Sequence, residues 1–89
     1  MSSREDLRSR IDELDELLLE LLNERARLAI EIAKLKERDG VPILDRERER
    51  AVVGRACAAN GGPMHRRTVS RIFRTVMRES RIMQIRAVR

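Results

Sequence analysis

Apolar residues recur at alternating steps of four and three between residues 7 and 35 of the chain. This is a heptad pattern held for about four heptads. Glycine and proline are absent between residues 5 and 38, where good helix formers predominate. The pattern therefore predicts one long helix from Glu5 to about Arg38, with a basic residue at one apolar position. The positions are Leu7, Ile11, Leu14, Leu18, Leu21, Arg25, Leu28, Ile32 and Leu35.

A helix of this length is too long for a compact monomer of 89 residues. About 34 residues at roughly 1.5 Å each span about 51 Å, whereas a compact chain of this size has a diameter near about 30 Å. The apolar face of the overhanging part needs a partner, and a second copy of the chain is the simplest one. We therefore expect an obligate homodimer.

Two further helices are predicted after the long one. Gly40 supplies a left-handed turn at the end of the first helix, and Asp45 opens a second helix over residues 46–59. The segment at 60–63, which contains two glycines and a proline, breaks that helix. A third helix then follows over residues 65–87. No segment has the pattern of a strand, so the expected fold is all-α, with a long, a short and a medium helix.

The composition is typical of one small domain, which we expect to comprise residues 1–89. Phe73 is the only aromatic residue, which argues against a platform for stacking nucleic-acid bases. The single cysteine, Cys57, excludes an intramolecular disulfide and suits a reducing compartment. Neither a signal-peptide pattern nor an apolar run near 18 residues is present, so we expect a cytoplasmic protein with no membrane partner.

Charge is distributed unevenly between the two halves of the chain. Residues 1–44 carry eight basic and eleven acidic residues, a net charge of −3, whereas residues 45–89 carry twelve arginines and four acidic residues, a net charge of +8. A basic half can bind nucleic acid, a membrane surface or a small anionic ligand. Part of this charge forms a stripe opposite the apolar face of the third helix, which is either a solvated face or a surface for nucleic acid. The stripe consists of Arg67, Arg71, Arg74, Arg78 and Arg81.

Each predicted helix also places polar residues on its apolar side. Arg25 and Lys36 lie eleven residues apart, so they project within about 20° of each other. The second helix contributes polar residues that share one face by i, i+3 and i, i+4 spacing, and the third contributes two that lie one turn apart. Buried charges are costly unless they are paired or used. The residues on these two helices are Asp45, Arg48, Glu49, Ser80 and Gln84.

Two interpretations fit these polar residues. In the first, Asp45 and Glu49 neutralise Arg25 and Lys36 in an internal salt-bridge network. In the second, the residues line a cavity inside a helical bundle, and its positive charge binds a multiply anionic small molecule. The sequence has no nucleophile–base pair, no cluster of His and Cys that could hold a metal, and no Gly-rich phosphate loop. Chemistry in such a cavity would therefore depend on positioning and electrostatics.

Six short segments are specific in their order and spacing, although each is weak alone. They are Leu-Arg-Ser-Arg-Ile-Asp-Glu-Leu-Asp (7–15), Leu-Leu-Asn-Glu-Arg-Ala-Arg-Leu-Ala (21–29), Ile-Ala-Lys-Leu-Lys (32–36), Pro-Ile-Leu-Asp-Arg-Glu-Arg-Glu (42–49), Ile-Phe (72–73) and Glu-Ser-Arg-Ile-Met-Gln (79–84). In these segments the chain resembles the all-helical chorismate mutases over nearly its whole length. The resemblance implies an intertwined homodimer with two active sites, each walled mainly by one chain. It also implies the rearrangement of chorismate to prephenate, without a cofactor, in the biosynthesis of phenylalanine and tyrosine.

The resemblance implies that four residues hold the carboxylates and the ether oxygen of chorismate. Arg25 and the partner chain's Arg8 would hold the two carboxylates. Lys36 and Gln84 would contact the ether oxygen, and Lys36 would also reach a carboxylate. Arg8 lies 17 residues before Arg25, about 100° away around the helix, so it could more easily enter the other site of a dimer.

The remaining site residues implied by the resemblance lie on the second and third helices. Glu49, with the backbone near Asp45, would take the substrate hydroxyl, and Arg48 and Ser80 would complete the lining. Catalysis itself would fall to Arg25, Lys36, Glu49 and Gln84.

Three other functions also fit the sequence. An isochorismate-pyruvate lyase shares the helical architecture and acts on a similar dicarboxylate. A regulatory module with a vestigial site is less consistent with the complete set of polar residues. A non-catalytic basic helical dimer that binds nucleic acid would use the arginine stripe, and its binding would depend steeply on salt. A chorismate mutase of this length could stand alone or form the amino-terminal part of a longer bifunctional enzyme.

Overall fold

The computed structural model describes residues 3–89, which form three α-helices and no strand. The helices are α1 (Arg4–Asp39), α2 (Arg46–Ala59) and α3 (Arg66–Ala87). All three begin and end within a residue or so of the positions predicted from the sequence, so the predicted all-α fold is confirmed. Within residues 3–89, none of the helices combines the length and the apolar character that crossing a membrane requires.

Both ends of α1 are capped by residues suited to the position. The Ser3 hydroxyl accepts a hydrogen bond from the Asp6 backbone N–H at 3.1 Å, and the Asp6 carboxylate accepts one from the Ser3 N–H, also at 3.1 Å. This reciprocal capping box satisfies donors that the first turn leaves free. At the other end Gly40 has a φ of 68°, in the left-handed region that a residue without a Cβ adopts readily. These caps set the length of α1.

The start of α2 depends on Asp45. Its carboxylate accepts a hydrogen bond from the backbone N–H of Arg48 at 2.9 Å, which is the usual bond of an N-cap aspartate. The cap holds the first turn of α2 in place, and that turn carries Arg48 and Glu49. α3, in contrast, begins after His65, which is exposed and makes no side-chain cap bond.

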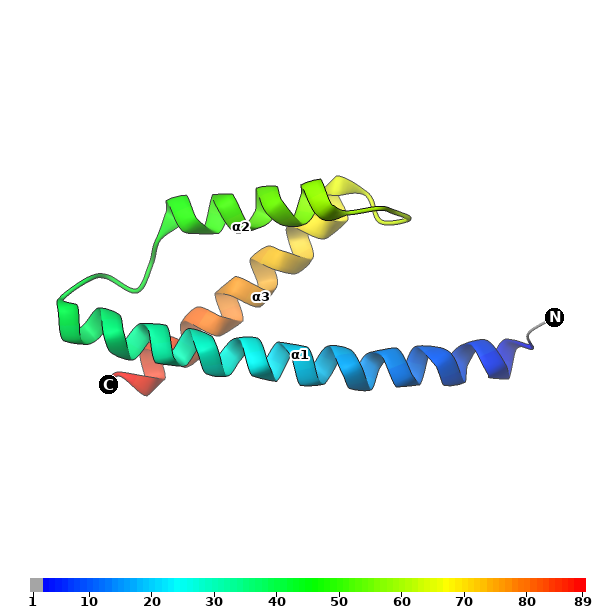
Figure 1. Cartoon of the computed structure of the whole chain (residues 1–89), viewed down its shortest axis with the longest axis horizontal. Helices are drawn as coiled ribbons and strands as arrows, with labels where there is room; N and C mark the ends of the chain where they lie inside the picture. The colour runs from blue at the N-terminus through cyan, green and yellow to red at the C-terminus, as the bar shows by residue number, and fades with distance from the viewer. Residues whose placement is uncertain (1–2) are drawn as a thin grey trace.

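α3 joins the other two helices, because it packs against α1 and α2 while those two do not pack directly on each other. In Figure 1 α2 runs above the C-terminal half of α1, and α3 crosses from one to the other. With this arrangement, residues of all three helices line one cavity.

The core of the chain is small. The buried apolar residues of the described chain are Ala26, Ala33, Val69 and Met77, and no large side chain is completely buried. The long axis of the molecule measures 57 Å and its radius of gyration is 16.2 Å, compared with about 12 Å for a compact domain of this length. The excess arises from the N-terminal half of α1, which extends beyond the other helices (Figure 1).

The extended helix exposes a long apolar surface. Eleven of its large apolar side chains are at least 36% exposed. Exposed apolar patches of such extent mark interaction surfaces in soluble proteins. We refer to these residues as the α1 apolar face. They are Leu7, Ile11, Leu14, Leu17, Leu18, Leu19, Leu21, Leu22, Leu28, Ile32 and Leu35.

Candidate active site

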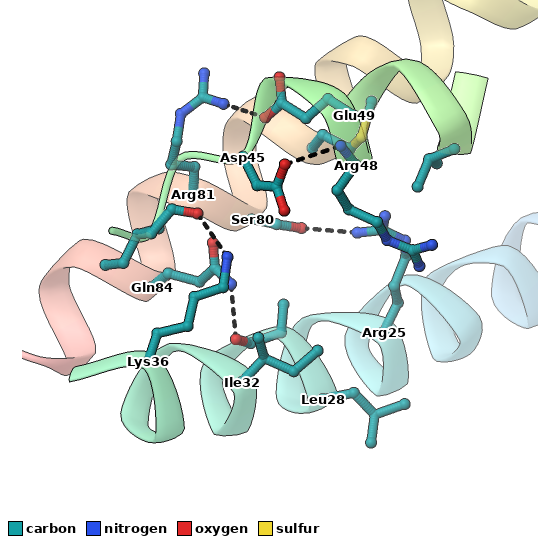
Figure 2. A pocket seen from close by; sticks show the side chains of 14 residues that line it. Arg25, Leu28, Ile32, Lys36, Asp45, Arg48, Glu49, Ser80, Arg81 and Gln84 are labelled. Carbon is teal, nitrogen blue, oxygen red and sulfur yellow. Dashed lines mark hydrogen bonds and ion pairs between the residues drawn. The ribbon is translucent and has the colours of Figure 1, made fainter. Parts of the chain in front are cut away.

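A cavity of about 290 Å³ lies between the three helices. Apolar side chains such as Leu28, Ile32 and Val52 form part of its wall. The structure brings seven of the eight site residues predicted from the sequence to this cavity, as Figure 2 shows. They are Arg25, Lys36, Asp45, Arg48, Glu49, Ser80 and Gln84.

Arg25 enters the cavity from α1 and is held by a residue of α3. Its Nη1 donates a hydrogen bond to the Ser80 hydroxyl at 3.2 Å. Ser80 is only 6% exposed, so its position is determined by packing. None of the carboxylates of residues 3–89 lies within ion-pair distance of Arg25. The guanidinium is therefore oriented by a neutral partner and keeps its charge available for an anion.

Lys36 and Gln84 are also positioned by neutral partners. The Lys36 ammonium donates to the Ile43 carbonyl oxygen at 3.0 Å, and the Gln84 amide nitrogen donates to the Ala29 carbonyl oxygen at 2.8 Å. An ammonium has three N–H donors and a primary amide has two. Each side chain thus retains at least one N–H after the bond that positions it (Figure 2).

The acidic residues at the cavity have partners other than Arg25 and Lys36. Glu49 forms an ion pair with Arg81, and both side chains are about one-third exposed. Asp45 accepts the N-cap bond of α2 and forms no ion pair among residues 3–89. The interpretation of an internal salt-bridge network between these acids and the α1 cations is therefore wrong for the described chain.

Arg81 lines the cavity, although the sequence interpretation assigned it to an exposed stripe opposite the apolar face of α3. That assignment is wrong for this residue. Arg81 follows Met77 by four positions, which on a helix leaves it only about 40° from that buried residue. It lies at the edge of the inward face, within reach of Glu49 on α2. The i, i+4 relation to Met77 was the signal that could have identified it.

Arg8 is the one predicted site residue that the chain's own cavity lacks. It is exposed on α1, about 26 Å along the helix axis from Arg25 given 1.5 Å per residue. A helix is stiff over this distance, so Arg8 has no route into the cavity of its own chain.

The cavity carries a net positive charge and has polar groups at several points of an otherwise apolar wall. Its lining includes four basic residues and two acidic ones, and clefts lined by one sign of charge concentrate ligands of the opposite sign. No group of three or more His, Cys, Asp or Glu within residues 3–89 has the arrangement of a metal site. The fold and the cavity together define a helical protein whose cavity has the charge and the polar groups suited to a small organic anion.

Comparison with known proteins identifies the family. The chain belongs to the chorismate mutase type II family, whose profile matches residues 7–85. It is 45% identical over 76 residues to the bifunctional chorismate mutase/prephenate dehydratase of Pseudomonas aeruginosa, with 80% of this chain and 21% of that protein covered. It is also 42% identical over 50 residues to the chorismate mutase of Methanocaldococcus jannaschii, covering 56% of this chain and 50% of the relative.

A solved structure agrees with this assignment. Form II of the chorismate mutase from Thermus thermophilus superposes with a TM-score of 0.91 at 32% sequence identity, covering 92% of this chain and 93% of that one. The chain spans only about a fifth of the length of the bifunctional relatives that it matches. These findings favour the chorismate mutase interpretation over the lyase and nucleic-acid alternatives.

Proposed function

We propose that this chain catalyses the rearrangement of chorismate to prephenate, an isomerase reaction on the route to phenylalanine and tyrosine. One observation carries the proposal. Arg25, Lys36 and Gln84 are held in one cavity by neutral partners only, so their remaining N–H groups are free for a ligand. Membership of the chorismate mutase type II family supports chorismate as that ligand.

In the proposed mechanism, the cavity first restricts the conformation of the substrate. The Arg25 guanidinium, oriented by Ser80, forms paired hydrogen bonds to one carboxylate, and Arg48 adds positive charge nearby. Fixing the carboxylates holds the chair-like conformer in which the two reacting carbon ends approach each other. Effective concentrations gained in this way account for a large part of the rate of intramolecular reactions.

The second contribution is electrostatic. A C–O bond breaks and a C–C bond forms in one intramolecular step, and negative charge develops on the ether oxygen. Lys36 and Gln84 direct N–H donors to that oxygen, because their other N–H groups bond to backbone carbonyls and fix both side chains. Donors prepositioned at a developing charge provide some of the largest catalytic effects known. No proton transfer or covalent intermediate is required.

The substrate hydroxyl is assigned to Glu49, together with the backbone near Asp45. The ion pair with Arg81 restrains the Glu49 carboxylate at the cavity edge, and Figure 2 shows that carboxylate pointing toward the Arg81 guanidinium. A carboxylate has more than two acceptor positions, so one oxygen can accept the substrate hydroxyl while the other stays paired.

We further propose that the active form is an intertwined homodimer. The α1 apolar face is exposed in the single chain, and burying each large apolar side chain in an interface contributes roughly 1.5–3 kcal/mol. A second copy packed along α1 would cover this face and bring its Arg8 to the second carboxylate of chorismate. On this proposal residues 1–89 act as one catalytic domain in the cytoplasm.

Incubation of the purified protein with chorismate, followed by identification of the product, tests the proposed activity. We expect prephenate from the wild type and almost none from Arg25→Ala. Arg27→Ala, which removes an exposed arginine two positions away on α1, is the matched control and should remain active. Release of pyruvate from isochorismate without turnover of chorismate would instead identify a lyase.

A further inference from the structure

A second cavity of about 330 Å³ lies between α2 and α3. We call it the outer groove. Two apolar residues, Val53 and Met77, contribute to its wall, and Glu49 is its one acidic residue. Its other lining residues are five arginines from the two helices. They are Arg46, Arg50, Arg74, Arg78 and Arg81.

Four of these arginines have no carboxylate partner. Within residues 3–89, Arg81 pairs with Glu49, but no acid lies within ion-pair distance of the other four. Arg46 and Arg50 lie four residues apart on α2, and Arg74 and Arg78 lie four residues apart on α3. Like charges at this spacing repel within each helix, and the two pairs also face the same groove. A bound anion would remove this repulsion.

The outer groove is distinct from the candidate active site. Glu49, Met77 and Arg81 line both cavities, so the Glu49–Arg81 ion pair forms part of the wall between them. The four unpaired arginines, in contrast, line the outer groove and not the candidate active site. Their charge is therefore not explained by the proposed reaction on chorismate.

We propose that the outer groove binds a small anion with more than one phosphate group. Arginine presents a planar fork of N–H donors that matches the oxygens of a phosphate, often with two parallel hydrogen bonds. With two arginines on each helix, one phosphate group can lie against α2 and a second against α3. The volume of the groove is at the lower end of the range of small-molecule sites, which run from roughly 300 to 1,000 Å³.

The arrangement fits a small anion better than nucleic acid. A nucleic-acid surface needs cations spread along the path of the phosphate backbone. Here the arginines of two helices instead converge on one limited volume, and Arg67 and Arg71, which continue the stripe along α3, do not line it. The chain also has a single aromatic residue, Phe73, which leaves little to stack on bases.

Titration calorimetry with inorganic pyrophosphate at low ionic strength, where charge interactions are least screened, tests this proposal. The test variant is Arg50→Gln/Arg78→Gln, which removes one groove cation from each helix. The matched control is Arg55→Gln/Arg71→Gln, which removes one exposed arginine from each helix outside the groove. We expect the test variant to bind pyrophosphate about a hundredfold more weakly, since it loses two charged hydrogen bonds and each contributes about tenfold or more. The control should bind like the wild type.

Arg25→Gln serves to separate the two cavities. It should leave pyrophosphate binding unchanged, because Arg25 lines only the candidate active site. Calorimetry does not depend on turnover, so an inactive protein could still bind pyrophosphate, and an active one could fail to. The two proposals can therefore fail separately.

Five results would overturn the proposal. The first is the absence of pyrophosphate binding to the wild type, and the second is equal weakening by test and control variants. The third is a loss with Arg25→Gln but not with the groove variant, which would assign the anion to the candidate active site. The fourth is binding of duplex DNA but not pyrophosphate through the groove arginines. The fifth is a shift of the monomer–dimer equilibrium in the groove variant when the wild type binds no pyrophosphate. That result would mean that the groove arginines contact the second copy of the chain.

Discussion

Replacement of Gln84 by glutamate tests the proposed electrostatic step most directly. Gln84 donates one N–H to the Ala29 carbonyl oxygen at 2.8 Å and lines the cavity that Lys36 also enters. Because an amide does not titrate at ordinary pH, the wild type offers its donors at every pH. A carboxyl group has nearly the same size but donates a hydrogen bond only when protonated. Gln84→Glu should therefore be active at acid pH and lose activity as pH rises through the pKa of the new carboxyl group.

The expected loss of activity follows from the loss of the hydrogen-bond donor that Gln84 directs to the ether oxygen. In the ionised variant two oxygens replace the donor, and one of them lies against the Ala29 carbonyl while the other repels the charge developing on the ether oxygen. Gln84→Ala removes the donor without adding charge, and should lower kcat by roughly 10² to 10³, the loss observed for one oxyanion donor. The fold should tolerate this change, since a single net hydrogen bond contributes about 1 kcal/mol.

The assay is prephenate formation by the wild type, Gln84→Glu, Gln84→Ala and Gln84→Met from acid to alkaline pH. Gln84→Met keeps the length of the side chain but neither donates nor titrates, so its activity should be low and should follow the wild-type pH profile. Only Gln84→Glu should decline relative to the wild type with rising pH. Parallel profiles for Gln84→Glu and the wild type would remove Gln84 from the mechanism.

Three further predictions concern assembly and the cavity edge. Mixing inactive Arg8→Ala with inactive Arg25→Ala should restore activity to about a quarter of wild type, since random exchange gives half of the dimers one intact site; no recovery despite proven exchange would refute the shared site. The midpoint of thermal unfolding should rise with protein concentration, and a folded, concentration-independent monomer by ultracentrifugation would contradict the dimer. Arg81→Met should raise the KM for chorismate several-fold and change the free energy of unfolding by about 1 kcal/mol or less, because the Arg81–Glu49 pair is still partly open to solvent; an unchanged KM, equal to that of the control Arg71→Met, would show that Arg81 does not position Glu49.

The boundaries of the helices could be predicted because local chemistry determines them. Gly40 ends α1 in a conformation that disfavours residues with a Cβ, and the Asp45 carboxylate caps α2 through its own neighbour in sequence. Both effects act over a few residues and need no knowledge of the tertiary fold. The heptad pattern of α1 likewise repeats along one continuous segment.

The partners of the charged side chains could not be predicted in the same way. Helical spacing placed Asp45 and Glu49 on the face of α2 that turns toward the cavity, but it could not show which cation each would meet. That choice depends on how α3 packs between α1 and α2, which brings Arg81 to Glu49 and leaves Arg25 with Ser80. The salt-bridge interpretation failed at this step, because pairing across helices is a property of packing and not of sequence spacing.

The unpaired cations of the cavity can be understood from the cost of reorganisation. A cation already paired with a carboxylate would have to break that bond before it could bind a substrate carboxylate, and the new interaction would merely replace an old one. Arg25 and Lys36 are oriented instead by a hydroxyl and a backbone carbonyl, which fix their directions but compensate little of their charge. Groups held in this way retain most of their electrostatic attraction for an anion and reorganise little when it binds. Their exposure to the cavity lowers the cost of leaving them uncompensated, because both side chains are only half-buried. Thus the feature that distinguishes this cavity from a structural salt-bridge network is the neutral character of the partners that hold its two α1 cations.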